Sequence, residues 1–83
     1  MLTVDVKFVA YELVPGLLNA QYSVEAGTTV HSLLALCEAN CGASIPEKNY
    51  RYMYPLINGR PATLDSAITD NSTLHLCRVI TGG

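Results

Sequence analysis

Basic residues are few in this 83-residue sequence, and they are spread along its length. Only 14% of the residues are charged, and the basic ones are Lys7, Lys48, Arg51, Arg60 and Arg78. Proteins that bind nucleic acids concentrate Lys and Arg on one face or along one stripe. The sequence therefore predicts no nucleic-acid partner.

Long apolar runs are also missing. No run approaches the roughly 20 apolar residues that a membrane-spanning helix needs, so we expect no membrane partner. The opening MLTVDVKFVA alternates apolar and polar residues, whereas a signal peptide has a charged start and a continuous apolar segment. Three cysteines are an odd number for a disulfide framework. Together these features predict a protein of the reducing cytoplasm.

The residue groups of catalytic and metal centres are missing as well. The sequence shows no Ser/His/Asp or Cys/His arrangement, no phosphate-binding loop and no paired carboxylates, so we expect no active site of its own. A plant-type 2Fe–2S cluster needs four cysteines in a C-x4-C-x2-C…C pattern, and this chain has three at other spacings. We therefore expect no metal site and interpret Cys37 and Cys41 as small core residues.

What is present suffices for one small core, since 49% of the residues are hydrophobic. Residues 2–10 and 18–25 alternate apolar and polar side chains, and this period predicts two strands. The expected inward residues are Leu2, Val4, Val6, Phe8 and Ala10 in the first strand and Leu18, Ala20, Tyr22 and Val24 in the second. Pro15 and Gly16 fit a type II turn between them, which predicts a hairpin.

After residue 27 the period becomes helical. Thr29 is a suitable N-cap, and Gly42 is a suitable stop. Between them, apolar residues recur at helical spacing at Val30, Leu33, Leu34, Cys37 and Cys41. These signals predict a helix with one buried face.

Two more strands are expected in the second half, over residues 50–59 and 73–80, with a short one at 61–63. The first closes on the Asn58-Gly59 turn, and Pro55 places it near a sheet edge. The order strand, strand, helix, strand, strand predicts an α+β fold, a mixed four- to five-stranded sheet with one main helix packed on one face. We expect the first and last strands side by side at its centre, which is the β-grasp arrangement, with residues 1–80 as one domain.

Four segments carry a family resemblance, namely VEAGTTVHSLL, LINGRPATLD, DNSTLHL and the terminal TGG. With them the chain resembles, over nearly its whole length, the small ubiquitin-like sulfur-carrier proteins of the ThiS/MoaD type. The resemblance implies a protein co-substrate and not an enzyme, although it could be the small subunit of a sulfur-transferring enzyme. It binds no cofactor itself, and ATP is used by its activating partner.

The resemblance also assigns roles. An E1-like adenylating enzyme activates the carboxylate of Gly83, a sulfur donor converts it to a thiocarboxylate, and a sulfur-acceptor synthase receives the sulfur. That synthase is the large molybdopterin-synthase subunit or a thiazole synthase; VHSLL looks like the thiamine branch, and TGG with the long hairpin looks like the molybdopterin branch. We expect residues 81–83 to form a flexible activation tail. Gly82 and Gly83 have no side chains, so they can enter a narrow channel of the activating enzyme. Thr81 begins that tail.

Docking to these partners requires a surface on the folded body. If Met53, Pro55 and Ile57 face the helix, alternation turns Tyr52, Tyr54 and Leu56 to the open sheet face, with Val9 and Tyr11 nearby. The expected partner-binding residues are Leu56, His75, Cys77, Arg78, Val79 and Ile80. Alternatively, the loop 47–50 covers this face.

Two other functions fit the same sequence. A ubiquitin-like modifier would be joined through Gly83 to lysines of other proteins, after the same adenylation. A pure binding module would leave the terminal glycines unused.

Overall fold

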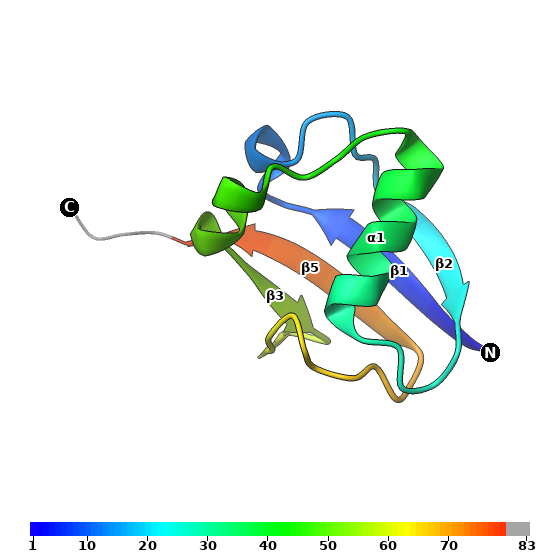
Figure 1. The fold of residues 1–83 in the computed structure, drawn as a ribbon. Coiled ribbons are helices and arrows are strands. Elements are labelled where there is room, and N and C mark those ends of the chain that lie inside the picture. Colours follow the sequence, from blue (N-terminus) through cyan, green and yellow to red (C-terminus); the bar gives the residue numbers. More distant parts are fainter. Residues whose placement is uncertain (80–83) are drawn as a thin grey trace.

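The computed structural model describes residues 1–79, which form a two-layer α+β fold (Figure 1). The strands are β1 (Leu2–Phe8), β2 (Ala20–Val24), β3 (Met53–Ile57), β4 (Arg60–Pro61) and β5 (Ser72–Arg78). The helix α1 (Val30–Cys41) lies across one face of the sheet, and the 3₁₀ segments are η1 (Tyr11–Leu13) and η2 (Glu47–Tyr52). Ile80, Thr81, Gly82 and Gly83 lie outside the described residues.

Within residues 1–79 the sheet order is β2-β1-β5-β3-β4. The first and last strands are parallel neighbours at its centre, with Val6 opposite Leu74 and Phe8 opposite Leu76. All four of these side chains are buried. Burial explains the arrangement, because the most apolar strands lose the most water-exposed area at the middle of a sheet that a helix covers. The predicted β-grasp topology is confirmed.

The helix α1 begins and ends where its local signals predict. The Thr29 hydroxyl oxygen accepts a hydrogen bond from the Ser32 backbone N–H at 3.1 Å, which satisfies one free donor of the first turn. Gly42 ends the helix in the left-handed conformation at φ 63°, which costs glycine least. The face directed at the sheet carries four buried residues, Val30, Leu33, Leu34 and Cys37.

The first hairpin departs from expectation in its strand bounds, since β1 ends at Phe8, η1 follows it and β2 begins at Ala20, and in the direction of one side chain. The predicted turn at Pro15-Gly16 is present, with Gly16 at φ 88° and the Leu17 N–H donating to the Val14 carbonyl at 3.1 Å. The turn closes on Leu17, which is buried, and the next side chain therefore points outward. Leu18 is 71% exposed and precedes β2, so its predicted inward position is wrong.

The third strand is shorter than predicted, because Tyr50–Tyr52 belong to η2. Alternation within β3 is as expected, with Met53 and Pro55 buried and Tyr54 exposed. The Pro55 carbonyl accepts from the Ala62 N–H at 3.0 Å on the outer side of the strand. The missing N–H of the proline therefore faces the sheet edge and removes no hydrogen bond to β5.

The three cysteines are free thiols, and Cys37 is fully buried. Burial raises the pKa of the Cys37 thiol above its ordinary value of 9.0, because the interior disfavours the thiolate. The folded protein therefore holds this proton at a pH where the unfolded chain releases it. Stability from this source is complete below the ordinary pKa and is lost as pH rises above it.

We expect Cys37→Ala to lower the free energy of unfolding at neutral pH by about 1–3 kcal/mol, as for a typical core truncation. The decline in stability above pH 9.0 should also become shallower than in the wild type. Urea unfolding followed by circular dichroism under reducing conditions measures both effects. Cys77→Ala, on the sheet face opposite α1, is the matched control, and equal flattening in both variants would contradict the assignment to Cys37.

Candidate functional site

The sheet face opposite α1, called the open face below, is built from outward residues of β1, β5 and β3. Register between β3 and β5 places Tyr54 opposite Cys77 and Leu56 opposite His75. Lys7 of β1 lies on the other side of His75. The Val9 N–H donates to the Leu76 carbonyl at 3.0 Å, which puts Val9 beside the end of β5.

Apolar side chains gather on this face where β5 ends. Tyr54 is 39% exposed, Tyr52 is 46% exposed and Val9 is 55% exposed. The Val79 N–H donates to the Tyr52 carbonyl at 2.7 Å, so the backbone directly after β5 lies beside that of Tyr52. We call this group the tail-base patch, and its members are Val9, Tyr52, Tyr54, Leu56, Cys77 and Val79.

The opposite half of the open face is polar. Asp5 lies between Gln21 and Thr73 in the sheet, and the Gln21 Nε2 donates to the Asp5 carboxylate at 3.0 Å. The Asn58 side-chain oxygen accepts from the Thr73 N–H at 2.9 Å. A sheet face exposed to water is ordinarily polar throughout. The exposed apolar half is therefore the candidate partner-binding surface.

The loop 47–50 does not cover the tail-base patch. Tyr50 packs against the core on the helix side, with its ring centroid 6.5 Å from that of His31 in α1. Burial raises the pKa of the Tyr50 hydroxyl, and the negative charge of Glu38 adds to the effect. The alternative in which this loop folds over the open face is therefore wrong.

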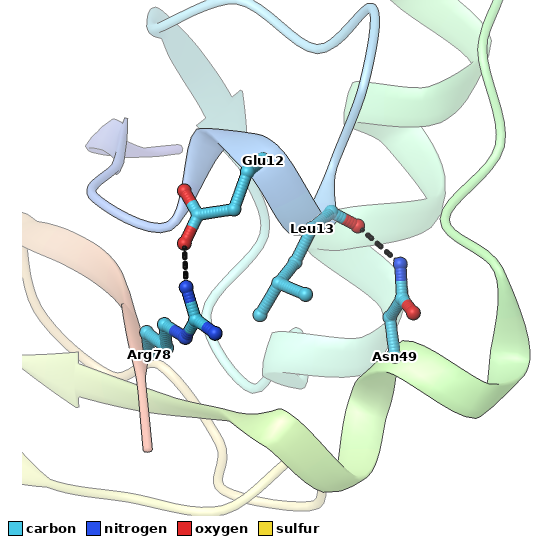
Figure 2. A network of polar contacts seen from close by, with 4 residues as sticks. All are labelled: Glu12, Leu13, Asn49 and Arg78. Carbon is cyan, nitrogen blue, oxygen red and sulfur yellow. Dashed lines mark hydrogen bonds and ion pairs between the residues drawn. The ribbon is translucent and has the colours of Figure 1, made fainter. Parts of the chain in front are cut away.

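Two polar contacts tie η1 to its neighbours at the base of the C-terminal segment (Figure 2). The Arg78 guanidinium donates to the Glu12 carboxylate at 2.8 Å, and both side chains remain substantially exposed, at 61% and 42%. The Asn49 side-chain amide donates to the Leu13 carbonyl at 2.8 Å. As a result, η1 is linked to the end of β5 on one side and to η2 on the other.

We expect Glu12→Gln to lower stability by less than about 1 kcal/mol, because exposed ion pairs are weak and screened by water. The difference from the wild type should shrink as salt concentration rises. Thermal unfolding at low and high salt measures it, with Glu25→Gln, an exposed glutamate after β2, as the control. A large loss of stability that does not change with salt concentration would contradict the interpretation of Glu12–Arg78 as a weak, exposed ion pair.

The structure brings together most of the residues predicted for partner binding. Leu56, His75, Cys77 and Val79 are half-buried on the open face. Arg78 lies opposite the buried Met53, so its side chain is on the other face, where it pairs with Glu12. Ile80, Thr81, Gly82 and Gly83 are outside the described residues. Sequence reasoning missed Glu12, since no local pattern marks a partner 66 positions away from Arg78.

No group of three or more His, Cys, Asp or Glu side chains within residues 1–79 is arranged to hold a metal ion. In the same part of the chain, α1 is too short to cross a membrane.

No protein-family model matches this sequence, and no curated protein matches it significantly. Solved structures do match. Small archaeal modifier protein 1 of Haloferax volcanii superimposes with a TM-score of 0.73 at 20% identity, over 96% of this chain and 100% of that one. A second structure of that protein gives a TM-score of 0.66 at 19% identity, over 98% and 99% of the two chains.

A Pyrococcus furiosus protein, provisionally named molybdopterin converting factor, subunit 1, gives a TM-score of 0.66 at 15% identity over 96% and 100%. The chain has the ubiquitin-like β-grasp fold. The superpositions cover nearly the whole of both chains, so this β-grasp protein and those neighbours share one architecture. At these identities the likeness concerns the fold.

Proposed function

We propose that this β-grasp protein is a sulfur carrier. Its Gly83 carboxylate is adenylated by an E1-like enzyme that uses ATP, and is then converted to a thiocarboxylate. The sulfur passes to a sulfur-acceptor synthase that makes molybdopterin or the thiazole of thiamine. The terminal Gly-Gly, the family resemblance of the segments before it and the fold shared with a molybdopterin converting factor subunit all support this proposal.

The position of the last described residues carries the proposal. Strand β5 ends at Arg78 in the middle of the sheet, and Val79 lies beside Tyr52. The four residues after Val79 can span at most about 14 Å when fully extended. An enzyme that reacts with Gly83 must therefore contact the body near the tail-base patch, where apolar side chains are exposed.

The chemistry needs a partner for a simple reason. A free α-carboxylate has a pKa of about 3.5, so it is ionised at neutral pH and resists attack by nucleophiles. Adenylation joins a carboxylate oxygen to the α-phosphorus of ATP and releases pyrophosphate. A sulfur nucleophile then attacks the carbonyl carbon, and AMP leaves. The enzyme must exclude water during this step, because water would hydrolyse the adenylate. Two glycines have no side chains, so they fit a channel narrow enough to keep water out.

A second candidate is a ubiquitin-like modifier joined through Gly83 to lysines. The observation that favours it is the fold similarity to small archaeal modifier protein 1, whose name describes that role. Both candidates begin with the same adenylation, so activation alone does not separate them.

Mass spectrometry of the protein from its own cells separates the two. A carrier should show free protein in which one oxygen is replaced by sulfur at Gly83, and replacing Cys37, Cys41 and Cys77 together should not remove that sulfur. A modifier should leave Val79–Gly83 on target lysines after trypsin, which cleaves after Arg78. Absence of both the thiocarboxylate and the lysine-linked remnant, in cells with an active pathway, would overturn both.

A further inference from the structure

The strand β2 leaves one edge of the sheet open. It pairs antiparallel with β1 over five consecutive positions, from Leu2–Val24 to Val6–Ala20, without a bulge. Within residues 1–79, no strand pairs with its other side, and Figure 1 shows β2 at the margin of the sheet. An unpaired edge of this kind is a template for a further strand.

Two hydrogen bonds show which residues present the free backbone groups. The Thr3 N–H donates to the Asn71 side chain on the β5 side, and the Phe8 N–H donates to the Asn19 side chain on the β2 side. Even-numbered residues of β1 therefore direct their backbone groups to β2. By the same alternation, Gln21 and Ser23 direct theirs away from β1 and into solvent.

This edge has none of the usual protection against pairing. Residues 18–24, LNAQYSV, contain no charged residue, no proline and no glycine. At the other edge, β4 is two residues long and consists of Arg60 and Pro61. Proteins block edge-to-edge contact with short edge strands, charges and prolines. The β4 edge has all three features, whereas the β2 edge lacks charge and proline.

Exposed apolar side chains flank the open edge. Leu18, directly before β2, is 71% exposed. Leu36 is 46% exposed and lies one helical turn before Asn40, whose amide donates to the Tyr22 hydroxyl at 3.2 Å. Residues four apart share a helix face, so Leu36 is on the side of α1 above β2.

We propose that β2 pairs antiparallel with β2 of a second copy of this chain, about a two-fold axis at Tyr22. In this register Gln21 lies opposite Ser23 of the second copy, and these residues exchange both backbone hydrogen bonds, because theirs are the outward groups. The two sheets become continuous, and both open edges disappear at once.

Charge and symmetry favour a second copy as the occupant. A strand with no charge over residues 18–24 offers no attraction to a charged peptide, whereas an identical neutral strand meets it without a like-charge clash. The two-fold axis is perpendicular to the continuous sheet, so the exposed Leu36 side chains of both copies lie on the same face of it. The interface lies at the sheet margin and leaves the tail-base patch open, so it does not depend on the proposed function.

Sedimentation equilibrium over a wide concentration range tests the proposal. The wild type should form dimers, and the double variant Gln21→Lys, Ser23→Lys should raise the dissociation constant at least about tenfold, since like charges then face each other across the axis. Mixing it with Gln21→Glu, Ser23→Glu should restore a dimer of the two. Thr73→Lys, on the same sheet face but away from the edge, should dimerise as the wild type does.

Hydrogen exchange of the wild type provides a test without mutation. The Gln21 and Ser23 amides should exchange more slowly as protein concentration rises, while the Tyr22 amide, directed at β1, should not change. A monomer at every concentration, dimers that survive the lysine variant, or failure of the mixed variants to pair would overturn the proposal. Protection of Gln21 and Ser23 only after a partner protein is added would also overturn it, by naming another occupant.

Discussion

Deletion of Gly83 should abolish adenylation by the activating enzyme and leave the fold unchanged. The reacting carboxylate would be moved back by one residue, and a misplacement of a few ångströms is enough to defeat a reaction that depends on orientation. The core of the described chain extends from Val4 to Leu76, so stability should not change. ATP–pyrophosphate exchange measures activation, and thermal unfolding measures the fold.

The control for this deletion is Thr81→Ser, which keeps the length of the chain and both glycines. It should retain exchange close to the wild-type rate. Normal exchange by the protein that lacks Gly83 would reject the sulfur carrier and the modifier together, because both begin at this carboxylate. Loss of exchange in both variants would instead show that the enzyme contacts the Thr81 side chain directly.

Leu56→Asp should weaken binding of the activating enzyme by roughly thirtyfold or more. Truncating or charging a central apolar anchor typically costs about 2 kcal/mol or more in binding, which is close to that factor. Leu56 is half-buried in the tail-base patch, on the opposite face from α1, so the substitution should not unfold the protein. Titration calorimetry on the folded variant measures the effect.

Leu36→Asp is the matched control, because it makes the same chemical change at an exposed leucine on the helix layer. Its affinity for the enzyme should equal that of the wild type. Val9→Asp, at a more exposed position of the patch, should weaken binding even if Leu56→Asp proves unstable. Unchanged affinity in both patch variants would mean that the partner binds another surface.

The elements with strong local signals were predictable from the sequence. The extent of α1, its Thr29 cap and its Gly42 stop depend on residues within a few positions of one another, and all three are confirmed. The Asn58-Gly59 turn is confirmed for the same reason, with both residues at positive φ. Alternation also assigned Met53 and Pro55 to the core and Tyr54 to the open face, as observed.

The errors arose where two local patterns compete. Leu17 and Leu18 are both apolar, and alternation alone does not say which one enters the core. The turn that closes on Leu17 decides it, because this turn sets the direction of the next side chain. Tyr50–Tyr52 read as strand by composition, but Tyr50 gains burial against the core from the 3₁₀ segment η2.

The sequence by itself determined the class of fold, the strand and helix periods and the chemistry expected of a Gly-Gly end. Only the tertiary structure decided which side chains meet. Cys77 and Tyr54 come from β5 and β3, Val9 directly follows β1, and their grouping depends on strand order and register. The Glu12–Arg78 pair and the open edge of β2 likewise follow from how distant segments pack. Periodicity tells which way a residue faces, whereas its neighbours are chosen by the burial of the whole core.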